Sequence, residues 1–387
     1  MKNKIQSLFI GLALVAGVHQ AAAQIVISSF SQNGVLVCTN LQTNTVASVQ
    51  WASSLAGPWQ TNWATLSGVT VSNNGTITVS VPMFYRVLGF AATNSAANNI
   101  PSGMALIPAG SFTMGDVADT NNYGDAAPLS VTVSAFYMDT NLVSYGQWTN
   151  VYAYATSHGY NFLHTGAGKN SAPNQPVQTV DWFDCVKWSN ARSQQAGLAP
   201  VYYTDAGLTQ VFTNGDNGTT VYQNLTTNGY RLPTEAEWEK AARGGLSGQR
   251  FPWGATITEN QANYNAYPLS LNLYGYFYDV NSYTGYNTNY NTGVSPYTSP
   301  VGSFAPNGYG LYDMAGNLFE WCWDWYGTPY GQPTTNNPTG AGPGSGLRVL
   351  RGGDWTYYAS GSRCASRVVN NPLNAYDVVG FRCVRGL

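Results

Sequence analysis

The sequence predicts an α+β fold that is rich in loops and is preceded by a small all-β module. In residues 25–90, short runs of strand-forming residues alternate with turn signals. Further along, three segments carry signals for the start of a helix, at Ser144, Asp181 and Thr234. The rest of the chain is rich in Gly, Asn and Tyr and has few long periodic segments, which indicates long irregular connections on a small frame.

Residues 1–23 are expected to be a secretion signal. Lys2 and Lys4 give it a charged start, residues 8–18 form an apolar run, and Ala21-Ala22-Ala23 is a small-residue cleavage site. The apolar run is shorter than the ~20 residues that a membrane-spanning helix needs, and no later segment approaches that length. We therefore expect a secreted, periplasmic or cell-surface protein without a membrane span.

Residues 24–90 are predicted to form a small β-sandwich-like module. Its expected strands are residues 25–28, 34–38, 46–51, 76–81 and 84–88. Nothing in these residues singles out a ligand site, so we assign the module the role of a spacer, with carbohydrate or surface attachment as the alternative. Residues 91–103 have almost no bulky apolar side chains and are expected to be a flexible linker. The main domain then comprises residues 104–387.

The three helices of the main domain are placed by their caps. Ser144 with Gln147, and Thr234 with Glu237, each match a capping box, in which a side chain accepts from an otherwise unpaired amide group. Asp181 caps a further helix. The residues expected on one face of that helix are Trp182, Cys185, Val186 and Ser189.

Composition excludes some classes of function. Charged residues make up only 9% of the chain, and the net charge of −2 comes without a basic cluster, which argues against nucleic-acid binding. Aromatic residues reach 14% and supply ample core material, so the low charge does not indicate disorder. Two Asn-, Thr-, Tyr- and Gly-rich insertions, residues 200–228 and 268–299, are expected to be long surface loops.

Common catalytic and metal-binding motifs are missing from the sequence. It contains no Gly-x-Ser-x-Gly, His-Glu-x-x-His, Cys-x-x-Cys or EF-hand pattern. The Gly-rich run 340–346 lacks the Lys-Ser/Thr ending of a phosphate-binding loop and is interpreted as an ordinary loop. Beyond the signal, the histidines are His158 and His164, and their spacing does not place them on one helix face. We interpret both as loop residues and not as metal ligands.

Three motifs of the main domain closely resemble the formylglycine-generating enzyme (sulfatase-modifying factor) family. They are Arg231-Leu-Pro-Thr-Glu-Ala-Glu-Trp238, Gly308-Tyr-Gly-Leu-Tyr-Asp-Met-Ala-Gly-Asn-Leu-Phe-Glu-Trp321, and the ending from Arg351-Gly352-Gly353-Asp354-Trp355 to Gly380-Phe381-Arg382-Cys383. This resemblance implies a C-type-lectin-like fold. The family's enzymes oxidise a sulfatase cysteine to formylglycine, and they bind copper through two cysteines placed shortly after the Gly-Gly turn.

In this chain the corresponding place contains no thiol. Residues 354–360 read Asp-Trp-Thr-Tyr-Tyr-Ala-Ser, and no cysteine lies between Gly353 and Arg363. Copper is therefore not expected, because copper(I) favours a pair of thiolates. A relocated copper pair formed by Cys322 and Cys364 is the alternative, and a disulfide between them is the simpler interpretation.

The resemblance also implies calcium. The matching ligands are the side chains of Asp313 and Glu320 and the carbonyl groups of Gly316 and Leu318. A second family site begins at Asn263-Tyr264, and its later acidic partner is obscured by the insertion 268–299. The alternative without calcium is that the two carboxylates hydrogen-bond to backbone amides.

In an exported protein, cysteines are expected to form disulfides. In the family's oxidases, the cysteine of the final Gly-Phe-Arg-Cys is bonded to a helix residue that corresponds here to Ser189, and Cys185 lies one turn earlier on the same face. The family partner of Cys364 corresponds to Ala242, which cannot pair. We therefore predict the pairs Cys185–Cys383 and Cys322–Cys364, with Cys38 free in the β module.

A second resemblance is to ligand-binding proteins that retroelements diversify on the same frame, between Arg-Gly-Gly-x-Trp and Gly-Phe-Arg. The residues here that fit such a display surface are Asp354, Thr356, Tyr357, Tyr358, Ser360, Asn370, Asn371, Asn374, Tyr376 and Asp377, with Trp355 as a half-buried anchor. Tyr offers rigid contact area, and Ser and Asn offer adaptable hydrogen bonds. If the segment is extended, Tyr357 and Tyr358 point to opposite faces, so only one is expected to be fully displayed.

We therefore expect a secreted, non-catalytic member of this family that binds an extracellular peptide, protein or glycan. The residues assigned to ligand binding are Asp354, Trp355, Tyr357, Tyr358 and Ser360. Two alternatives stay open: a formylglycine-generating oxidase that acts on a sulfatase cysteine, and a structural component of the cell surface.

Overall fold

The computed structural model describes residues 26–30, 35–39, 46–51, 69–70, 72–73, 76–80, 85–89, 100–119, 126–216, 218–273, 275–328, 330–331 and 334–387. The chain divides into two compact units, Met1–Ser95 and Ala96–Leu387. The division falls inside residues 91–103, where the sequence predicts a linker. The predicted signal, residues 1–23, lies outside the described residues.

The first unit contains two three-stranded antiparallel sheets, in the orders β1-β2-β5 and β4-β3-β6. The strands are β1 (Val26–Phe30), β2 (Val35–Thr39), β3 (Val46–Trp51), β4 (Val69–Thr70), β5 (Ile77–Ser80) and β6 (Tyr85–Gly89). Each of the five predicted strands has a counterpart here, and the two-residue β4 was not predicted. Cys38 lies in β2, and its side chain is outside the described part of the chain.

The second unit has three α-helices: α1 (Tyr145–Ser157), α2 (Trp182–Gln195) and α3 (Glu235–Ala242). All three begin where the sequence predicts. The Ser144 hydroxyl accepts from the Gln147 amide at 3.2 Å, and Asp181 accepts from the Asp184 amide at 2.7 Å. At α3 the capping box is complete, because Glu237 also accepts from the Thr234 amide at 2.8 Å. These caps satisfy amide groups that a helix N-terminus leaves unpaired.

Two four-stranded sheets form the frame of this unit, in the orders β13-β20-β10-β7 and β18-β17-β16-β19. Their strands are β7 (Met104–Ile107), β10 (Phe136–Asp139), β13 (Tyr230–Arg231), β20 (Val384–Arg385), β16 (Phe319–Trp325), β17 (Arg348–Arg351), β18 (Val368–Asn370) and β19 (Val379–Gly380). Short pairs complete it: β8 (Gly110–Met114) with β9 (Leu129–Val133), β11 (Tyr202–Tyr203) with β12 (Tyr222–Gln223), and β14 (Asn265–Ala266) with β15 (Gly285–Tyr286). Two 3-10 turns, Lys169–Ser171 and Pro343–Ser345, lie in the connections.

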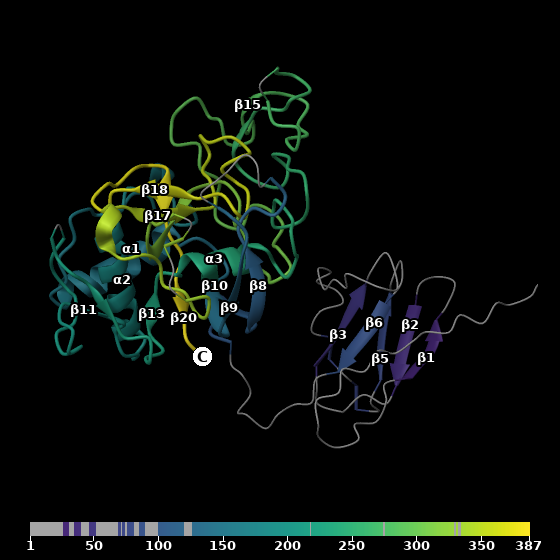
Figure 1. Ribbon diagram of the computed structural model, residues 1–387, viewed down its shortest axis with the longest axis horizontal. Coiled ribbons are helices and arrows are strands. Elements are labelled where there is room, and N and C mark those ends of the chain that lie inside the picture. The colour runs from purple at the N-terminus through teal and green to yellow at the C-terminus, as the bar shows by residue number, and fades with distance from the viewer. Residues whose placement is uncertain are drawn as a thin grey trace, which may run out of the picture. The chain divides into compact units, whose positions relative to one another are not determined.

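Two large buried clusters make the core of the second unit. In the first, α1 and α2 lie side by side (Figure 1), and the rings of Trp148 and Trp188 stack at 5.8 Å, with Phe381 edge-on to both. The second packs α3, through Trp238, against β8, β9, β16 and β17. Helices are few and loops are long, so the second unit is α+β and loop-rich, as predicted. Among the described residues, no helix is long and apolar enough to cross a membrane.

Candidate functional site

The segment after β17 turns sharply at two glycines. Gly352 and Gly353 have φ values of +97° and +77°, which L-residues rarely adopt. A Cβ atom on Gly353 would also lie 2.8 Å from the Ser362 hydroxyl and 2.9 Å from its amide nitrogen. The turn therefore requires glycine, and the segment that follows it contacts Asn317 and Asn265.

The buried Asp354 side chain holds this segment by hydrogen bonds and is not exposed to solvent. Its Oδ1 atom accepts from the Thr356 amide and hydroxyl, at 2.5 and 2.6 Å, and from the Tyr357 amide at 3.0 Å. Asp354 is 2% exposed, and burial raises its pKa to about 6 although these hydrogen bonds favour the carboxylate. Ser360 is also buried. The prediction that Asp354 and Ser360 face a ligand is therefore wrong, because the turn points both of them inward.

Trp355 anchors the segment. It is buried between the rings of Tyr286 and Tyr297, with centroid distances of 5.7 and 5.0 Å, and its amide donates to the Asn317 carbonyl at 3.1 Å. Its indole N–H donates to the Asp377 carbonyl at 3.5 Å, which joins the segment to the loop before β19. Trp355 thus contributes to the core under the surface and not to the surface itself.

Tyr357 and Tyr358 are both exposed, at 45% and 40%. The expectation that only one would be displayed is wrong, because residues 355–356 form a turn and the alternation of an extended strand does not apply. The Tyr357 ring lies edge-on to buried Phe319 at 5.6 Å. The Tyr358 ring is 5.0 Å from Tyr267 and 6.1 Å from Tyr276.

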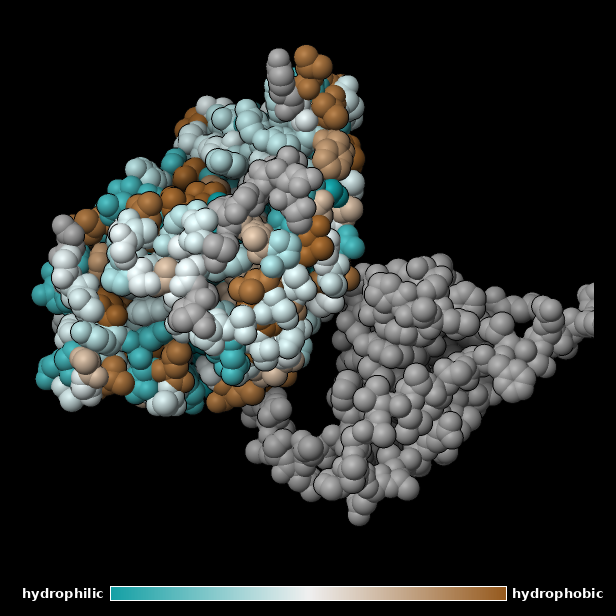
Figure 2. Space-filling view, in the orientation of Figure 1, coloured by the Kyte–Doolittle hydropathy of each residue, from teal (hydrophilic) through white to brown (hydrophobic). Residues whose placement is uncertain are grey.

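Tyr267, Tyr276, Tyr357 and Tyr358 together are called the aromatic surface below. Sequence reasoning missed Tyr267 and Tyr276, although the tyrosine-rich insertion 268–299 was the signal for them. The same insertion carries exposed apolar side chains: Leu269, Leu271, Leu273, Phe277 and Val280. On the face drawn in Figure 2 apolar residues are scattered over the unit, and some of them lie at the top, in the region of the loops that carry β15 in Figure 1. Other residues of the predicted display surface, Asn371, Tyr376 and Asp377, are exposed as well.

The cysteines of the second unit are free thiols. Cys185, Cys322, Cys364 and Cys383 are all fully buried, and the predicted disulfides Cys185–Cys383 and Cys322–Cys364 are not formed in the structure. Cys383 Sγ lies 3.4 Å from the Ser189 hydroxyl, the position at which the family resemblance put its partner. Cys322 and Cys364 both lie in the cluster around α3. Burial raises the pKa of Cys364 and Cys383 to about 12 and the pKa of Cys185 and Cys322 well above their usual value.

The predicted calcium segment, 313–320, contains one carboxylate oxygen that suits a cation. Asp313 is 5% exposed, and its Oδ2 accepts from the Gly302 amide at 2.8 Å. Within the described part of the chain, Asp313 Oδ1 is buried without a hydrogen-bond partner. Burial raises the pKa of Asp313 to about 6, because it disfavours the charged carboxylate. Asp313 therefore fits a calcium ligand.

Glu320 does not fit the role of a calcium ligand, because both of its carboxylate oxygens already have partners in the protein. Its two oxygens accept from Arg382 Nε at 2.7 Å and Nη2 at 2.8 Å, and Trp238 Nε1 donates to it at 3.0 Å. Glu320 and Arg382 are both fully buried. The carboxylate is thus already neutralised by a two-point ion pair that links β16 to the end of the chain.

The second predicted metal position, Asn263-Tyr264, is occupied by protein hydrogen bonds. The Asn263 side chain donates to the Tyr297 carbonyl at 2.8 Å, and the backbone carbonyl of Asn263 accepts from the Asn317 backbone amide at 2.7 Å. The Tyr264 hydroxyl donates to Asp279 at 2.9 Å. These contacts tie the base of the insertion 268–299 to the Asp313–Glu320 segment, beneath the aromatic surface.

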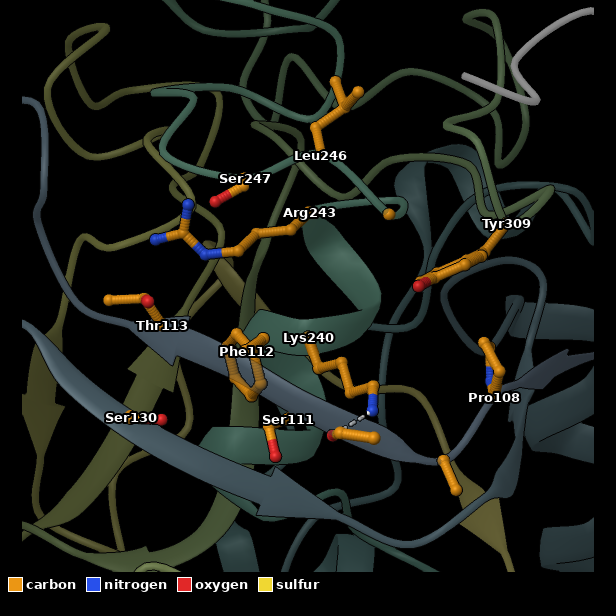
Figure 3. Close-up of a pocket in the computed structure, with 13 residues that line it drawn as sticks. Pro108, Ser111, Phe112, Thr113, Ser130, Lys240, Arg243, Leu246, Ser247 and Tyr309 are labelled. Atoms are coloured by element: carbon orange, nitrogen blue, oxygen red, sulfur yellow. Dashed lines mark hydrogen bonds between the residues drawn. The ribbon is translucent and has the colours of Figure 1, made fainter. Parts of the chain in front are cut away.

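A cavity of about 470 Å³ lies between α3 and the β8–β9 pair (Figure 3). Lys240 and Arg243 extend into it from α3, and Ser111 and Thr113 line it from β8. Both cations are engaged: Lys240 Nζ donates to the Gly110 carbonyl at 2.6 Å, and Arg243 donates to Glu239 and to the Gly115 carbonyl. None of the residues predicted to bind a ligand or a metal lines this cavity.

Comparisons with known proteins agree with the motifs. The family model described as "Sulfatase-modifying factor enzyme 1-like domain" matches residues 90–387. Formylglycine-generating enzyme from Bos taurus is 34% identical over 300 residues, which is 73% of this chain and 74% of that protein. Formylglycine-generating enzyme from Thermomonospora curvata is 32% identical over 316 residues, which is 76% of this chain and 97% of that protein.

Solved structures show the same fold. Treponema denticola variable protein 1 superposes with a TM-score of 0.54 and 26% identity, over 73% of this chain and 95% of that one. CarF superposes with a TM-score of 0.53 and 27% identity, over 74% of this chain and 99% of that one. The second unit therefore has the C-type-lectin-like fold that the motifs implied, and the chain belongs to the sulfatase-modifying factor (formylglycine-generating enzyme) family.

Proposed function

We propose that this chain is a secreted, non-catalytic member of its family that binds an extracellular peptide or glycan through the aromatic surface. The observation that carries the proposal is that Tyr357 and Tyr358 are exposed on the segment after the Gly-Gly turn, where the resemblance puts the family's thiol pair and this chain has no thiol. Tyr357 and Tyr358 sit on a segment that the Gly-Gly turn, Asp354 and Trp355 hold rigidly. Rigid aromatic side chains bind partners at a low entropy cost, which suits a recognition surface.

The state of the cysteines supports the absence of oxidase chemistry. A thiol that binds copper or reacts with oxygen must be accessible as a thiolate. The four described cysteines are buried, and burial raises the pKa of each. The close relationship to formylglycine-generating enzymes favours the competing hypothesis, an oxidase that acts on a sulfatase cysteine.

We expect no conversion of a Cys-x-Pro-x-Arg peptide to the aldehyde, with copper supplied in excess. The expected copper(I) affinity is also weak, because residues 354–362 contain no thiol. Mass spectrometry of the peptide and competition with a copper(I) chelator measure the two properties. Aldehyde formation, or stoichiometric tight binding of copper(I), would contradict this prediction.

A screen of the purified mature chain against glycan and peptide arrays tests the binding proposal directly. A saturable ligand that is lost in Tyr358→Ala and retained in Tyr222→Ala supports it. Tyr222 is a suited control, because it is 38% exposed in the separate β11–β12 pair. Binding that is unaffected by changes at Tyr357 and Tyr358 would place the ligand elsewhere, and the lack of any ligand would favour a structural role at the cell surface.

We also propose that calcium stabilises the 313–320 segment, held by Asp313 with the carbonyls of Gly316 and Leu318. The unpartnered Asp313 Oδ1 supports this, because calcium prefers several oxygen ligands. A bound cation would neutralise a carboxylate that the fold otherwise leaves uncompensated.

Chelation of calcium is expected to lower the melting temperature of the mature chain. Calcium at 100 times its Kd would stabilise the fold by about 2.7 kcal/mol. Asp313→Asn should remove this dependence, whereas Asp205→Asn, a change in an exposed turn, should leave it intact. Differential scanning calorimetry with and without chelator measures the shift. If chelator leaves the melting temperature of the parent chain unchanged and elemental analysis finds no calcium, the segment is a hydrogen-bonded turn that binds no calcium.

A further inference from the structure

A second group of metal-ligand side chains lies at the start of α2, away from the C-terminal segment. His164, in the loop between α1 and α2, meets Asp181 and Asp184, and one ligand atom from each lies within 4.8 Å of the others. His164 Nδ1 is 2.9 Å from Asp184 Oδ2 and 3.7 Å from Asp181 Oδ2. The loop is fixed in place, because the amides of Leu163 and His164 donate to the Asp184 carboxylate at 2.9 and 3.1 Å.

One oxygen of this group has no hydrogen-bond partner. Asp181 Oδ1 caps α2 by accepting from the Asp184 amide, which leaves Oδ2 turned toward His164. Asp181 is completely buried, and among the described residues no donor forms a hydrogen bond with its Oδ2. A buried carboxylate oxygen without a donor is costly, so its position needs a compensating cation or proton.

The protein itself supplies too little positive charge at this point. Lys187 Nζ is 2.8 Å from Asp216 and 3.6 Å from Asp184, and it also donates to the Gly215 carbonyl. Three carboxylates, those of Asp181, Asp184 and Asp216, thus lie around a single ammonium group. A divalent cation would neutralise the group.

We propose that His164, Asp181 and Asp184 form a binding site for a zinc-class divalent transition metal. One imidazole nitrogen and two carboxylate oxygens are a ligand set that zinc uses, with solvent at the fourth position. Atoms bound tetrahedrally at about 2.1 Å are about 3.4 Å apart, and the His164 Nδ1 separations of 2.9 and 3.7 Å lie on either side of this value. The His164 side chain is 27% exposed, which gives the metal an entry from solvent.

The proposed metal site is independent of the proposed ligand binding. Its ligands determine how metal binding depends on pH and which metal binds. Zinc would bind the lone pair of His164 Nδ1 with the ring proton on the other nitrogen, and a protonated imidazole cannot bind it, so binding should weaken at low pH. Calcium is disfavoured here because it prefers oxygen ligands. The sequence did not reveal the group, because the partners of His164 are two aspartates on a helix that lies further along the chain.

Isothermal titration of the mature, tag-free chain with zinc chloride at pH 7.5, with calcium in excess, tests the proposal. We expect saturable binding of one zinc ion and a higher melting temperature. Asp181→Asn keeps the helix cap but removes the charge, and both it and His164→Ala should abolish the saturable binding. His158→Ala is the matched control, because His158 stacks on Tyr154 outside the group.

Two results would overturn the site. The first is no saturable zinc binding to the folded parent chain, and the second is zinc binding that Asp181→Asn and His164→Ala leave unchanged. Circular dichroism of each variant shows whether it is folded. If one variant fails to fold, the other one together with the parent chain still decides the outcome.

Discussion

Replacing Glu320 by Gln is expected to lower the free energy of unfolding by about 3–5 kcal/mol, because it leaves the Arg382 guanidinium buried without its counter-charge. Both side chains are fully buried and joined by two charge-assisted hydrogen bonds. Arg382 also donates to the Tyr312 carbonyl at 2.9 Å, so the pair ties the last strand region to the 313–320 segment. Urea unfolding of the parent chain and the variant measures the loss.

This variant also separates the ion pair from the calcium site. Since Glu320 is ion-paired with Arg382 and does not bind calcium, its replacement should lower the stability by the same amount in calcium and in chelator. The double replacement of Glu320 by Leu and Arg382 by Met should be less destabilising than the sum of the single changes. A loss that appears only in the presence of calcium would instead make Glu320 a calcium ligand.

Local signals in the sequence predicted the regular elements well. Each α-helix begins one residue after its predicted cap, at Ser144, Asp181 or Thr234. A cap is recognised from residues three apart in the chain, so no tertiary information is needed. The five predicted strands of the first unit were found for a similar reason, since their alternation with turns is local.

Contacts that only the folded chain creates were not predictable from the sequence. Glu320 was assigned to calcium by resemblance, and its pairing with Arg382 joins residues far apart in the chain. Asp354 was expected to face solvent, but the Gly-Gly turn directs its carboxylate to the amides of Thr356 and Tyr357. His164 was interpreted as a loop residue, and only the fold places it beside Asp181.

The aromatic surface contains two residues that were identified from the sequence and two that only the structure places there. Tyr357 and Tyr358 were singled out from the sequence, because they fit the display surface of the ligand-binding proteins that the C-terminal ending resembles. Tyr267 and Tyr276 lie beside them because the chain near Asn265 packs against the C-terminal segment. There the Asn265 amide donates to the Tyr357 carbonyl, and Asn265 forms a β-bridge with Tyr358. The aromatic surface therefore has more aromatic contact area than the C-terminal segment alone indicates.

Replacing Tyr358 by Ala is expected to weaken binding of the array-identified ligand by about 30-fold, which corresponds to ~2 kcal/mol for an aromatic anchor at a binding centre. The change should barely move the melting temperature, because the ring is 40% exposed and packs on two other half-exposed tyrosines, Tyr267 and Tyr276. Biolayer interferometry and calorimetry on the same preparations give the two values.

Tyr357→Ala provides the internal comparison for this prediction. The Tyr357 ring rests on buried Phe319 and lies close to Gly361, so its removal should weaken binding and also cost some stability. Tyr222→Ala should change neither property. If both Tyr357→Ala and Tyr358→Ala unfold the chain, the two rings belong to the core, and the ligand must bind elsewhere. If both variants fold and bind like the parent chain, the aromatic surface is not the binding site, because its two central side chains contribute nothing to the affinity.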